Sequence, residues 1–240
     1  MEATNTAYNL IDSIQRMDDI LNSQNICEHK DSIQSRNTLT FTNGYYVNCS
    51  AIFVDICGSS GLTSDHTRPI LAKIYRCFIS ELVALFNGES RCREISINGD
   101  CVWGVFETPY KSDIDAMIDV AAKASSLINI MNNKLQKKGY QTIEVGIGID
   151  YGRALMAKAG YKGSTINDVI WMGDVVNNAC HLCSYGNQTF SDCRVMISNI
   201  IYNNCCDKYK NLFQWNYNRN CYHGDIEYSW EQQACNENQF

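Results

Sequence analysis

The spacing of apolar and polar residues divides the first part of the chain into a helix, a linker, a strand and a second helix. Residues 8–22 carry apolar side chains at helical spacing with aspartate and glutamine between them, which predicts an amphipathic helix. Residues 23–43 are polar and typical of a linker. Residues 45–54 are rich in β-branched and aromatic side chains and predict a strand, and residues 68–87, with Pro69 in the first turn, predict a long helix.

The rest of the chain continues as alternating strands and helices. Two short strands at 94–97 and 101–106 flank Asn98-Gly99-Asp100, and Asn-Gly between β-rich runs is a strong hairpin signal. The pattern then predicts a helix at about 112–138, strands at 142–149, 169–172 and 194–198, a helix at about 174–185, and a β-pair in the aromatic tail. The order β-α-β-β-α-β predicts an α+β fold of the ferredoxin-like (βαββαβ) type.

These elements group into three parts. The N-terminal helix and linker occupy residues 1–43, a central domain occupies 44–205, and a β-rich C-terminal extension occupies 206–240. The first helix either packs on the core of its own chain or joins two copies of the chain, and its pattern favours neither interpretation.

Composition narrows the class of protein. The chain has 240 residues and a formal net charge of -6, which argues against a nucleic-acid partner. Its apolar runs are too short for a membrane helix, and the N-terminus lacks the pattern of a signal peptide. The 13 cysteines include many within apolar stretches, where cysteine behaves as a small hydrophobe. We therefore expect a reduced, cytoplasmic protein without a membrane partner.

Two aspartates lie at a strand end and in a hairpin turn, positions that often hold catalytic or metal-binding residues. Asp55 ends a strand and is followed by a turn in which Gly58, Ser59 and Ser60 let backbone N–H groups approach an anion. Asp100 lies at the tip of the hairpin, next to the first strand in a ferredoxin-like sheet, so the two carboxylates could converge. Such a pair, with phosphate oxygens, suits Mg²⁺ or Mn²⁺. Singly, each aspartate is more often a cap or a turn residue.

Four motifs in order make the chain resemble the class III nucleotidyl cyclases over about residues 44–200. The first is FVDICGSS at 53–60, and the second is INGD at 97–100. The third is GIDYG at 148–152, and the last is WMGDVVN at 171–177, with one inserted position relative to the family.

The resemblance implies a mechanism and a partner. It makes Asp55 and Asp100 the catalytic ligands of two Mn²⁺ or Mg²⁺ ions, assisted by the backbone carbonyl of Ile56. It makes Asn177 the residue that orients the ribose of a nucleoside triphosphate. It also implies a head-to-tail homodimer with shared active sites.

Three departures from the family concern substrate choice. A base-reading Lys or Glu is replaced by Ser96, a base-reading Asp or Cys by Ile170, and the transition-state arginine by His181. The overall sequence resembles the pyrimidine cyclases of bacterial Pycsar antiphage systems, which make cyclic CMP or cyclic UMP for a separate effector. Ser96 can donate or accept and does not decide between CTP and UTP, although CTP is slightly preferred. The alternatives are an adenylate cyclase and a catalytically inactive nucleotide-binding module.

Other residues are candidates for substrate contacts. Arg93, Lys158 and Lys162 could supply the charge that the missing arginine would have given, although each is more often a surface cation. Tyr45 or Tyr46 could stack on the base, and core packing is the commoner role for either.

Overall fold

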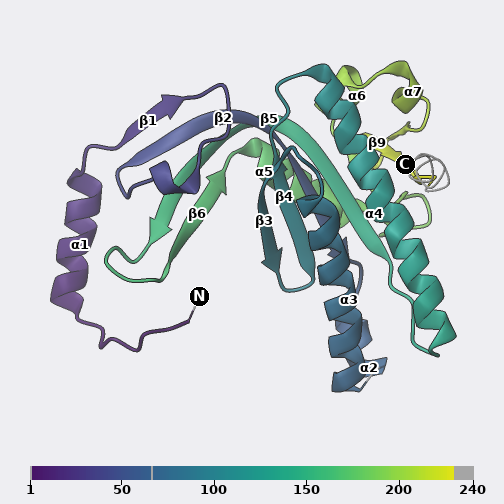
Figure 1. Ribbon diagram of the computed structural model, residues 1–240, viewed down its shortest axis with the longest axis horizontal. Coiled ribbons are helices and arrows are strands. Elements are labelled where there is room, and N and C mark those ends of the chain that lie inside the picture. The colour runs from purple at the N-terminus through teal and green to yellow at the C-terminus, as the bar shows by residue number, and fades with distance from the viewer. Residues whose placement is uncertain (1, 66, 230–240) are drawn as a thin grey trace, which may run out of the picture.

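The computed structural model describes residues 2–65 and 67–229 of the chain (Figure 1). Its described strands form one nine-stranded sheet with the order β3-β4-β2-β5-β7-β9-β8, in which β1 pairs with β2 and β6 pairs with β5. The strands are β1 (Ile26–His29), β2 (Asn43–Ile56), β3 (Cys92–Asn98), β4 (Cys101–Phe106), β5 (Val145–Gly160), β6 (Asn167–Met172), β7 (Val195–Ile197), β8 (Gln214–Asn216) and β9 (Cys221–Gly224). The helices are α1 (Leu10–Asn22), the 3-10 turn η1 (Arg36–Thr38), α2 (Ser59–Asp65), α3 (Arg68–Asn87), α4 (Lys111–Lys137), α5 (Asp174–Tyr185), α6 (Asn199–Asn204) and α7 (Asp207–Lys210).

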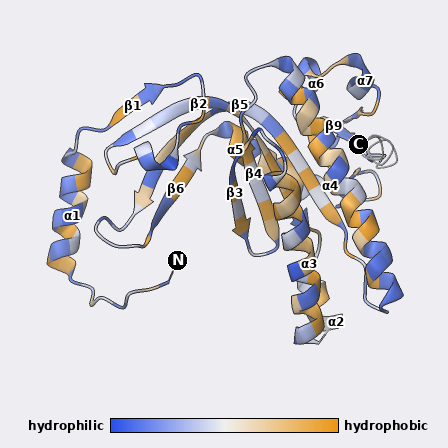
Figure 2. Cartoon of the chain, in the orientation of Figure 1, coloured by the Kyte–Doolittle hydropathy of each residue, from blue (hydrophilic) through white to orange (hydrophobic). Residues whose placement is uncertain are grey.

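The larger hydrophobic core lies between the sheet and helices α3 and α4. Phe78 and Phe86 of α3 and Met117 of α4 are essentially inaccessible to solvent and pack with the sheet residue Phe106. Figure 2 shows hydrophobic and hydrophilic residues along both helices, as expected for helices with one buried and one exposed side. The predicted α+β fold is confirmed, and α3 has the predicted bounds of 68–87.

Helix α5 covers the opposite face of the sheet and lies unusually close to β5. A Cβ added at Gly146 would be 2.0 Å from the carbonyl oxygen of Cys183, and one at Gly148 would be 2.1 Å from that of Ala179. The two glycines therefore allow the backbones of α5 and β5 to meet. The contact fixes the position of α5 and completes a second core that includes Phe53, Met156, Trp171 and Ala179.

Strand β5 is longer than the predicted strand at 142–149. It begins at Val145 and continues to Gly160, because Gly152 stays within the sheet opposite Cys49 and does not end the strand. Its final residues pair with β6 from Leu155↔Met172 to Gly160↔Asn167. We call residues 155–172 the arm, which extends toward α1 in Figure 1.

The prediction that residues 23–43 form a linker is wrong, because this segment is structured. It contains β1 and η1, and its Leu39 is only 5% exposed within the second core. The backbone N–H of Ile33 donates to Glu107 Oε1 at 3.2 Å. We call residues 30–42 the strap. Its few apolar side chains hold it on the same face of the sheet as α5, beside that helix, where they pack in the second core.

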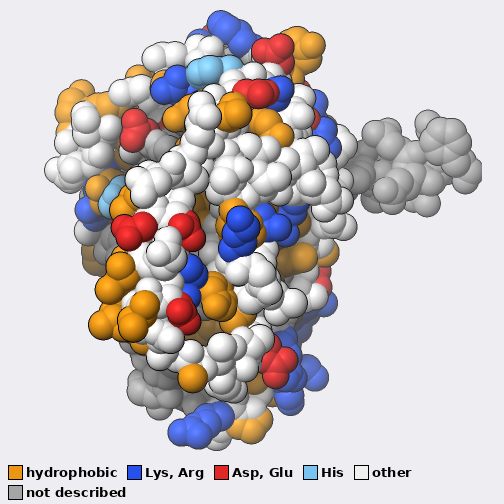
Figure 3. Space-filling model, turned by 90° about the vertical axis from the view of Figure 1, so that its left-hand side faces the viewer, with side chains coloured by type: hydrophobic (Ala, Val, Ile, Leu, Met, Phe, Trp, Pro, Cys, Tyr) orange, Lys and Arg blue, Asp and Glu red, His pale blue; other side chains and the backbone are white. Residues whose placement is uncertain are grey.

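Helix α1 buries none of its residues in the chain. Its exposed apolar side chains include Ile11, Ile20 and Leu21, which are 77%, 64% and 81% exposed. On the face of the molecule that carries α1, hydrophobic and charged groups are scattered among other polar groups (Figure 3). The interpretation that α1 packs on its own core is therefore wrong, and its role in joining two copies stays a prediction. No helix among the described residues combines the length and apolar character needed to cross a bilayer.

The C-terminal extension forms the predicted β-pair, in which β8 pairs with β9 and β9 joins the sheet beside β7. Residues 230–240 of this extension lie outside the described residues. The pair is anchored by an ion pair in which the partly exposed Arg219 donates through Nη2 to Oδ2 of the buried Asp192 at 2.8 Å. Asn216 Nδ2 also donates to Asp192 Oδ1 at 2.9 Å.

This anchor predicts a pH-dependent contribution to stability. Hydrogen bonds from Arg219 lower the pKa of Asp192 from 3.8 to about 2. Because the folded-state pKa is below that of the unfolded chain, the stabilisation is present above about pH 4 and is lost as the pH falls through about 2. We expect Asp192→Asn to lower the free energy of unfolding by about 2 kcal/mol at pH 7. Urea unfolding at pH 7 and at pH 3 measures this, and an equal effect at both pH values would contradict the assignment.

Candidate active site

The two predicted catalytic aspartates come from adjacent strands at one end of the sheet. Asp55 near the end of β2 pairs with Cys101 of β4, and Asp100 directly precedes Cys101 in the β3–β4 turn. Gly99 makes this turn with φ +64°, a backbone conformation that favours glycine. Asp55 is half-buried, and its pKa is raised by burial first and by the negative charge of Asp100 second. The structure thus brings the two carboxylates together.

This pair of carboxylates fits a divalent cation. Two like charges in a partly desolvated site repel each other, and a cation between them would remove that repulsion. The residues that could hold it are Asp55 and Asp100, with the backbone carbonyl of Ile56 at the same strand end. No group of three or more His, Cys, Asp or Glu side chains that could hold a metal occurs in the part of the chain that the structure describes. The remaining ligands would come from water and substrate oxygens, as is usual for Mg²⁺.

The turn after Asp55 leads directly from β2 into α2. The N–H of Cys57 donates to the carbonyl of Glu144 at 2.8 Å, and Gly58 adopts φ +62°. Ser59 and Ser60 are the first residues of α2. The predicted substrate-binding residues Gly58, Ser59 and Ser60 therefore lie immediately beyond the carboxylate pair.

Tyr75 is a residue at this site that sequence reasoning missed. It lies on α3, forms a hydrogen bond with Ser59, and has its pKa raised by burial, by Asp100 and by Asp55. Its hydroxyl therefore lies near both carboxylates and links α3 to the start of α2. No motif signals it, because an aromatic residue on an amphipathic helix is usually a packing residue.

Several thiols surround Asp55 and remain protonated at neutral pH. Burial, followed by the charge of Asp55, raises the pKa of Cys101 to about 12 and that of Cys57 to about 11. The same causes raise the pKa of Cys180 on α5. Because Mg²⁺ and Mn²⁺ prefer oxygen ligands, we do not expect these thiols among the ligands of such an ion.

Helix α5 carries the other predicted catalytic residues. Ala179 and Cys183 are buried, with the backbone of this part of α5 against β5, whereas Asn177 and His181 are exposed. Asn177 and His181 are four residues apart, so they lie one turn from each other on the same side of α5. The structure therefore presents these two side chains to solvent or to a second chain.

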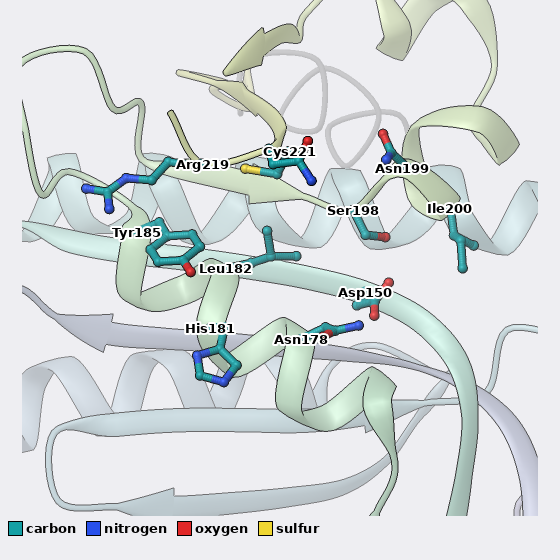
Figure 4. A pocket seen from close by; sticks show the side chains of 11 residues that line it. Asp150, Asn178, His181, Leu182, Tyr185, Ser198, Asn199, Ile200, Arg219 and Cys221 are labelled. Atoms are coloured by element: carbon teal, nitrogen blue, oxygen red, sulfur yellow. The ribbon is translucent and has the colours of Figure 1, made fainter. Parts of the chain in front are cut away.

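A cavity of about 490 Å³ lies beside α5 and includes His181 but neither of the carboxylates Asp55 and Asp100. Asp150, which lines it, is 3% exposed and accepts hydrogen bonds from Ser198, the Tyr151 N–H and Asn178. Figure 4 shows Asn178 projecting from α5 toward Asp150. Asp150 thus ties the first half of α5 to β5 and to the residue before α6.

The two predicted base-reading positions lie on different faces of the sheet. Ser96 on β3 pairs with Trp103, whose ring stacks on Phe53 at 4.9 Å. Ile170 on β6 is 38% exposed, whereas its neighbours Val169 and Trp171 pack into the second core with Trp103. The structure therefore does not bring Ile170 to Ser96. Relative to the family motif, the chain has one extra residue, Met172, between Trp171 and Gly173. Because side chains alternate between the two faces of a strand, this insertion moves Ile170 to the outer face and places Val169 on the face of the second core.

Other predicted contacts have partners within the chain. Arg93 Nε donates to Glu107 Oε2 at 2.8 Å, and Tyr46 stacks on His29 at 5.1 Å. The structure places neither residue at the carboxylate pair. Two further candidates are held elsewhere, since Lys158 lies 5.3 Å from the Phe41 ring centroid and Tyr45 packs against the second core. Lys162, the remaining cation, is exposed on the loop of the arm.

Comparisons with known proteins show the family of the chain. The Adenylate and Guanylate cyclase catalytic domain family matches residues 41–214. A uridylate cyclase from Gulbenkiania mobilis is 37% identical over 85% of this chain and 82% of its own. A uridylate cyclase from Treponema porcinum is 35% identical over 90% of this chain and 74% of its own.

Solved structures share the fold. A class III adenylyl cyclase-like ATP-binding protein from Pseudomonas aeruginosa matches 98% of this chain with a TM-score of 0.70 at 17% identity. The chain spans 55% of that protein's length. The adenylyl cyclase CyaB from P. aeruginosa matches 71% of this chain with a TM-score of 0.59. The carboxylate pair, the fold and the family match over most of the chain lead to one assignment: the chain belongs to the adenylate and guanylate cyclase catalytic domain family, the class III nucleotidyl cyclases.

Proposed function

We propose that this chain is a metal-dependent uridylate cyclase, which converts UTP to 3′,5′-cyclic UMP and pyrophosphate. The observation that carries the reaction is the convergence of Asp55 and Asp100 at one end of the sheet in a class III cyclase fold. The support for UTP is the 37% and 35% identity with two proteins named uridylate cyclase. This replaces the slight preference for CTP that the sequence alone suggested.

In the proposed reaction the ribose 3′-oxygen attacks the α-phosphorus. The bond from that phosphorus to the bridging oxygen breaks, pyrophosphate leaves, and the hydroxyl proton passes to solvent. Asp55 and Asp100 would hold two Mg²⁺ or Mn²⁺ ions, which lower the pKa of the attacking hydroxyl and neutralise the phosphate charge. Asn177 would donate to or accept from the ribose and hold the 3′-oxygen in line. His181 stands near it, where the family has an arginine.

The proposed site needs a second copy of the chain. Asn177 and His181 are exposed on α5, and the apolar side of α1 and the arm both extend from the same end of the molecule (Figure 1). A head-to-tail homodimer would let α5 of one chain face the carboxylates of the other and form two shared sites. In this proposal the cyclic product acts in the cytoplasm on a separate effector in antiphage defence.

The reaction is tested by its product. The purified chain is incubated separately with ATP, GTP, CTP and UTP in Mn²⁺, and cyclic nucleotides are identified by mass spectrometry. We expect cyclic UMP as the main product. Cyclic AMP or cyclic GMP as the main product would contradict the pyrimidine assignment. Nucleotide binding without any cyclic product would support instead the inactive nucleotide-binding module.

A further inference from the structure

A charged cluster links the strap to two strands of the sheet. Arg36 in η1 forms an ion pair with Glu94 of β3, in which Nε lies 3.2 Å from Oε1, and its Nη2 donates to Asp168 Oδ1 of β6. The strap thereby bridges the space between the two strands that carry Ser96 and Val169. Arg36 lies before residues 41–214, the part of the chain that the cyclase family matches.

The cluster lies on the face of β3 that carries Ser96. Glu94 and Ser96 are two positions apart in a stretch of regular pairing, from Glu94↔Val105 to Ser96↔Trp103. Their side chains therefore point to the same face, about 7 Å apart along the strand. Asp55 also lies on this face, because its pairing partner Cys101 is two residues before Trp103.

The charges of the cluster do not cancel. One guanidinium faces two carboxylates, which leaves a formal charge of −1 when all three are ionised. The side chain of Glu94 is only 12% exposed, whereas those of Arg36 and Asp168 are 51% and 55% exposed. A partly desolvated carboxylate with acceptor capacity to spare binds an N–H donor strongly. The guanidinium beside it has further N–H donors that can bind a carbonyl oxygen.

We propose that Glu94 and Arg36 read the pyrimidine base, with Glu94 accepting a hydrogen bond from N3–H of uracil and Arg36 donating to the neighbouring carbonyl O4. This inference deepens the proposed function and rests on it. Uracil presents a donor at N3 and an acceptor at O4, which match a carboxylate and a guanidinium. Cytosine presents an unprotonated N3 and an amino group at the same positions, so both contacts become repulsive or unpaired.

The packing around the cluster also favours a small base. Ile33 and Leu39 of the strap and the inward side chains Trp103 and Val169 all pack on the second core. A purine is larger than a pyrimidine and would need more room beside these side chains. The strap therefore contributes the guanidinium of Arg36 and also apolar side chains on the face of the sheet that carries Ser96.

A matched ion-pair cluster just before the start of β3 provides a control. Arg91 donates to Glu89 Oε1 at 3.0 Å and to Asp113 Oδ1 at 2.7 Å, which is again one guanidinium between two carboxylates. The side chain of Glu89 is 17% exposed, close to the 12% of Glu94. Glu89→Gln therefore reproduces the loss of charge and ion pairing without touching the proposed base site.

The test is the preference of the full chain for UTP over CTP. We expect Glu94→Gln to lower the ratio of kcat/KM for UTP to that for CTP by roughly 10- to 100-fold, since a charge-assisted hydrogen bond is lost and the amide can donate to cytosine N3. Arg36→Lys, at an exposed position, should lower the same ratio in the same direction. Glu89→Gln should leave the ratio unchanged. An unchanged ratio in folded Glu94→Gln and Arg36→Lys would overturn the proposal.

A binding measurement separates this inference from the proposed function. The 3′-deoxy analogues of UTP and CTP lack the attacking hydroxyl, so calorimetric titration in Mn²⁺ reports base preference without turnover. We expect the wild type to bind the uridine analogue more tightly and Glu94→Gln to lose that preference. Equal binding of both analogues by the wild type would overturn the base-reading role even if cyclic UMP is formed. Failure to form any cyclic product, with the binding preference intact, would count against the cyclase function alone.

Discussion

Asp55→Asn and Asp100→Asn should each lower the rate of cyclic UMP formation by about 10³-fold or more. Each substitution removes one carboxylate from the pair that would hold the divalent ions, and several kcal/mol of charge stabilisation in the transition state depends on those ions. Stability should respond in the opposite direction. Burial and the charge of Asp100 raise the pKa of Asp55, so its ionised form costs the folded state free energy at neutral pH, and a neutral asparagine removes that cost.

Two measurements check this prediction together. Cyclic UMP is quantified by mass spectrometry, and the thermal midpoint is measured without metal, where we expect it to be unchanged or raised in Asp55→Asn. A variant that keeps more than a tenth of wild-type activity would contradict the assignment of that aspartate. Loss of activity together with a clear drop in the thermal midpoint would show that the substitution acts through the fold and not through the metal site.

A mixing experiment extends the prediction to the shared site. Asp55→Asn and Asn177→Ala should each be inactive as homodimers. In a mixed dimer one of the two sites would hold both intact sets of residues, so activity should return on mixing. Mixed chains that form dimers and stay inactive would contradict a site built from two chains.

Gly148→Ala should destabilise the chain strongly. The added Cβ would lie 2.1 Å from the carbonyl oxygen of Ala179 and 2.2 Å from the nitrogen of Cys183. Both are backbone atoms of α5, so the helix must move away from β5 as a whole. We expect a loss of about 3–5 kcal/mol in the free energy of unfolding, the range of severe core overpacking. Because α5 carries Asn177 and His181, activity should fall with it.

Gly152→Ala on the same strand is the matched control. Its Cβ would meet only the Val175 Cβ at 3.4 Å, an ordinary van der Waals contact. Urea unfolding of the two variants should therefore give very different midpoints. Similar stability of Gly148→Ala and Gly152→Ala would contradict the close approach of α5 to β5.

The sequence predicts the parts of the fold that depend on local pattern. The helix at 68–87 and the hairpin at Asn98-Gly99-Asp100 follow from periodicity and turn chemistry, and both are present in the structure. The length of β5 could not be predicted from the sequence. A glycine such as Gly152 weakens a strand locally, and here its pairing with Cys49 keeps it in the sheet. The sequence of the strap is typical of a linker, because its few apolar residues find their partners only in the tertiary structure.

In the candidate site, too, some features could be predicted from the sequence and others depend on the tertiary structure. Asp55 and Asp100 could be placed together because strand order fixes which strands are neighbours. Tyr75 could not be predicted, since only the packing of α3 brings its hydroxyl to Ser59. The inward position of Val169 depends on one extra residue before Gly173, and a one-residue shift in a strand exchanges its faces. The contact of Arg36 with Glu94 joins residues far apart in the sequence and needs the folded strap.

The most direct test of the central claim is a competition among the four ribonucleoside triphosphates. Equimolar ATP, GTP, CTP and UTP are incubated with the full chain and Mn²⁺ in one reaction, with Asp55→Asn as the blank, and all cyclic products are quantified by mass spectrometry. A metal-dependent uridylate cyclase gives cyclic UMP in excess over the other three products, and none with Asp55→Asn. A purine cyclic nucleotide as the main product, or equal product from the wild type and Asp55→Asn, would contradict it.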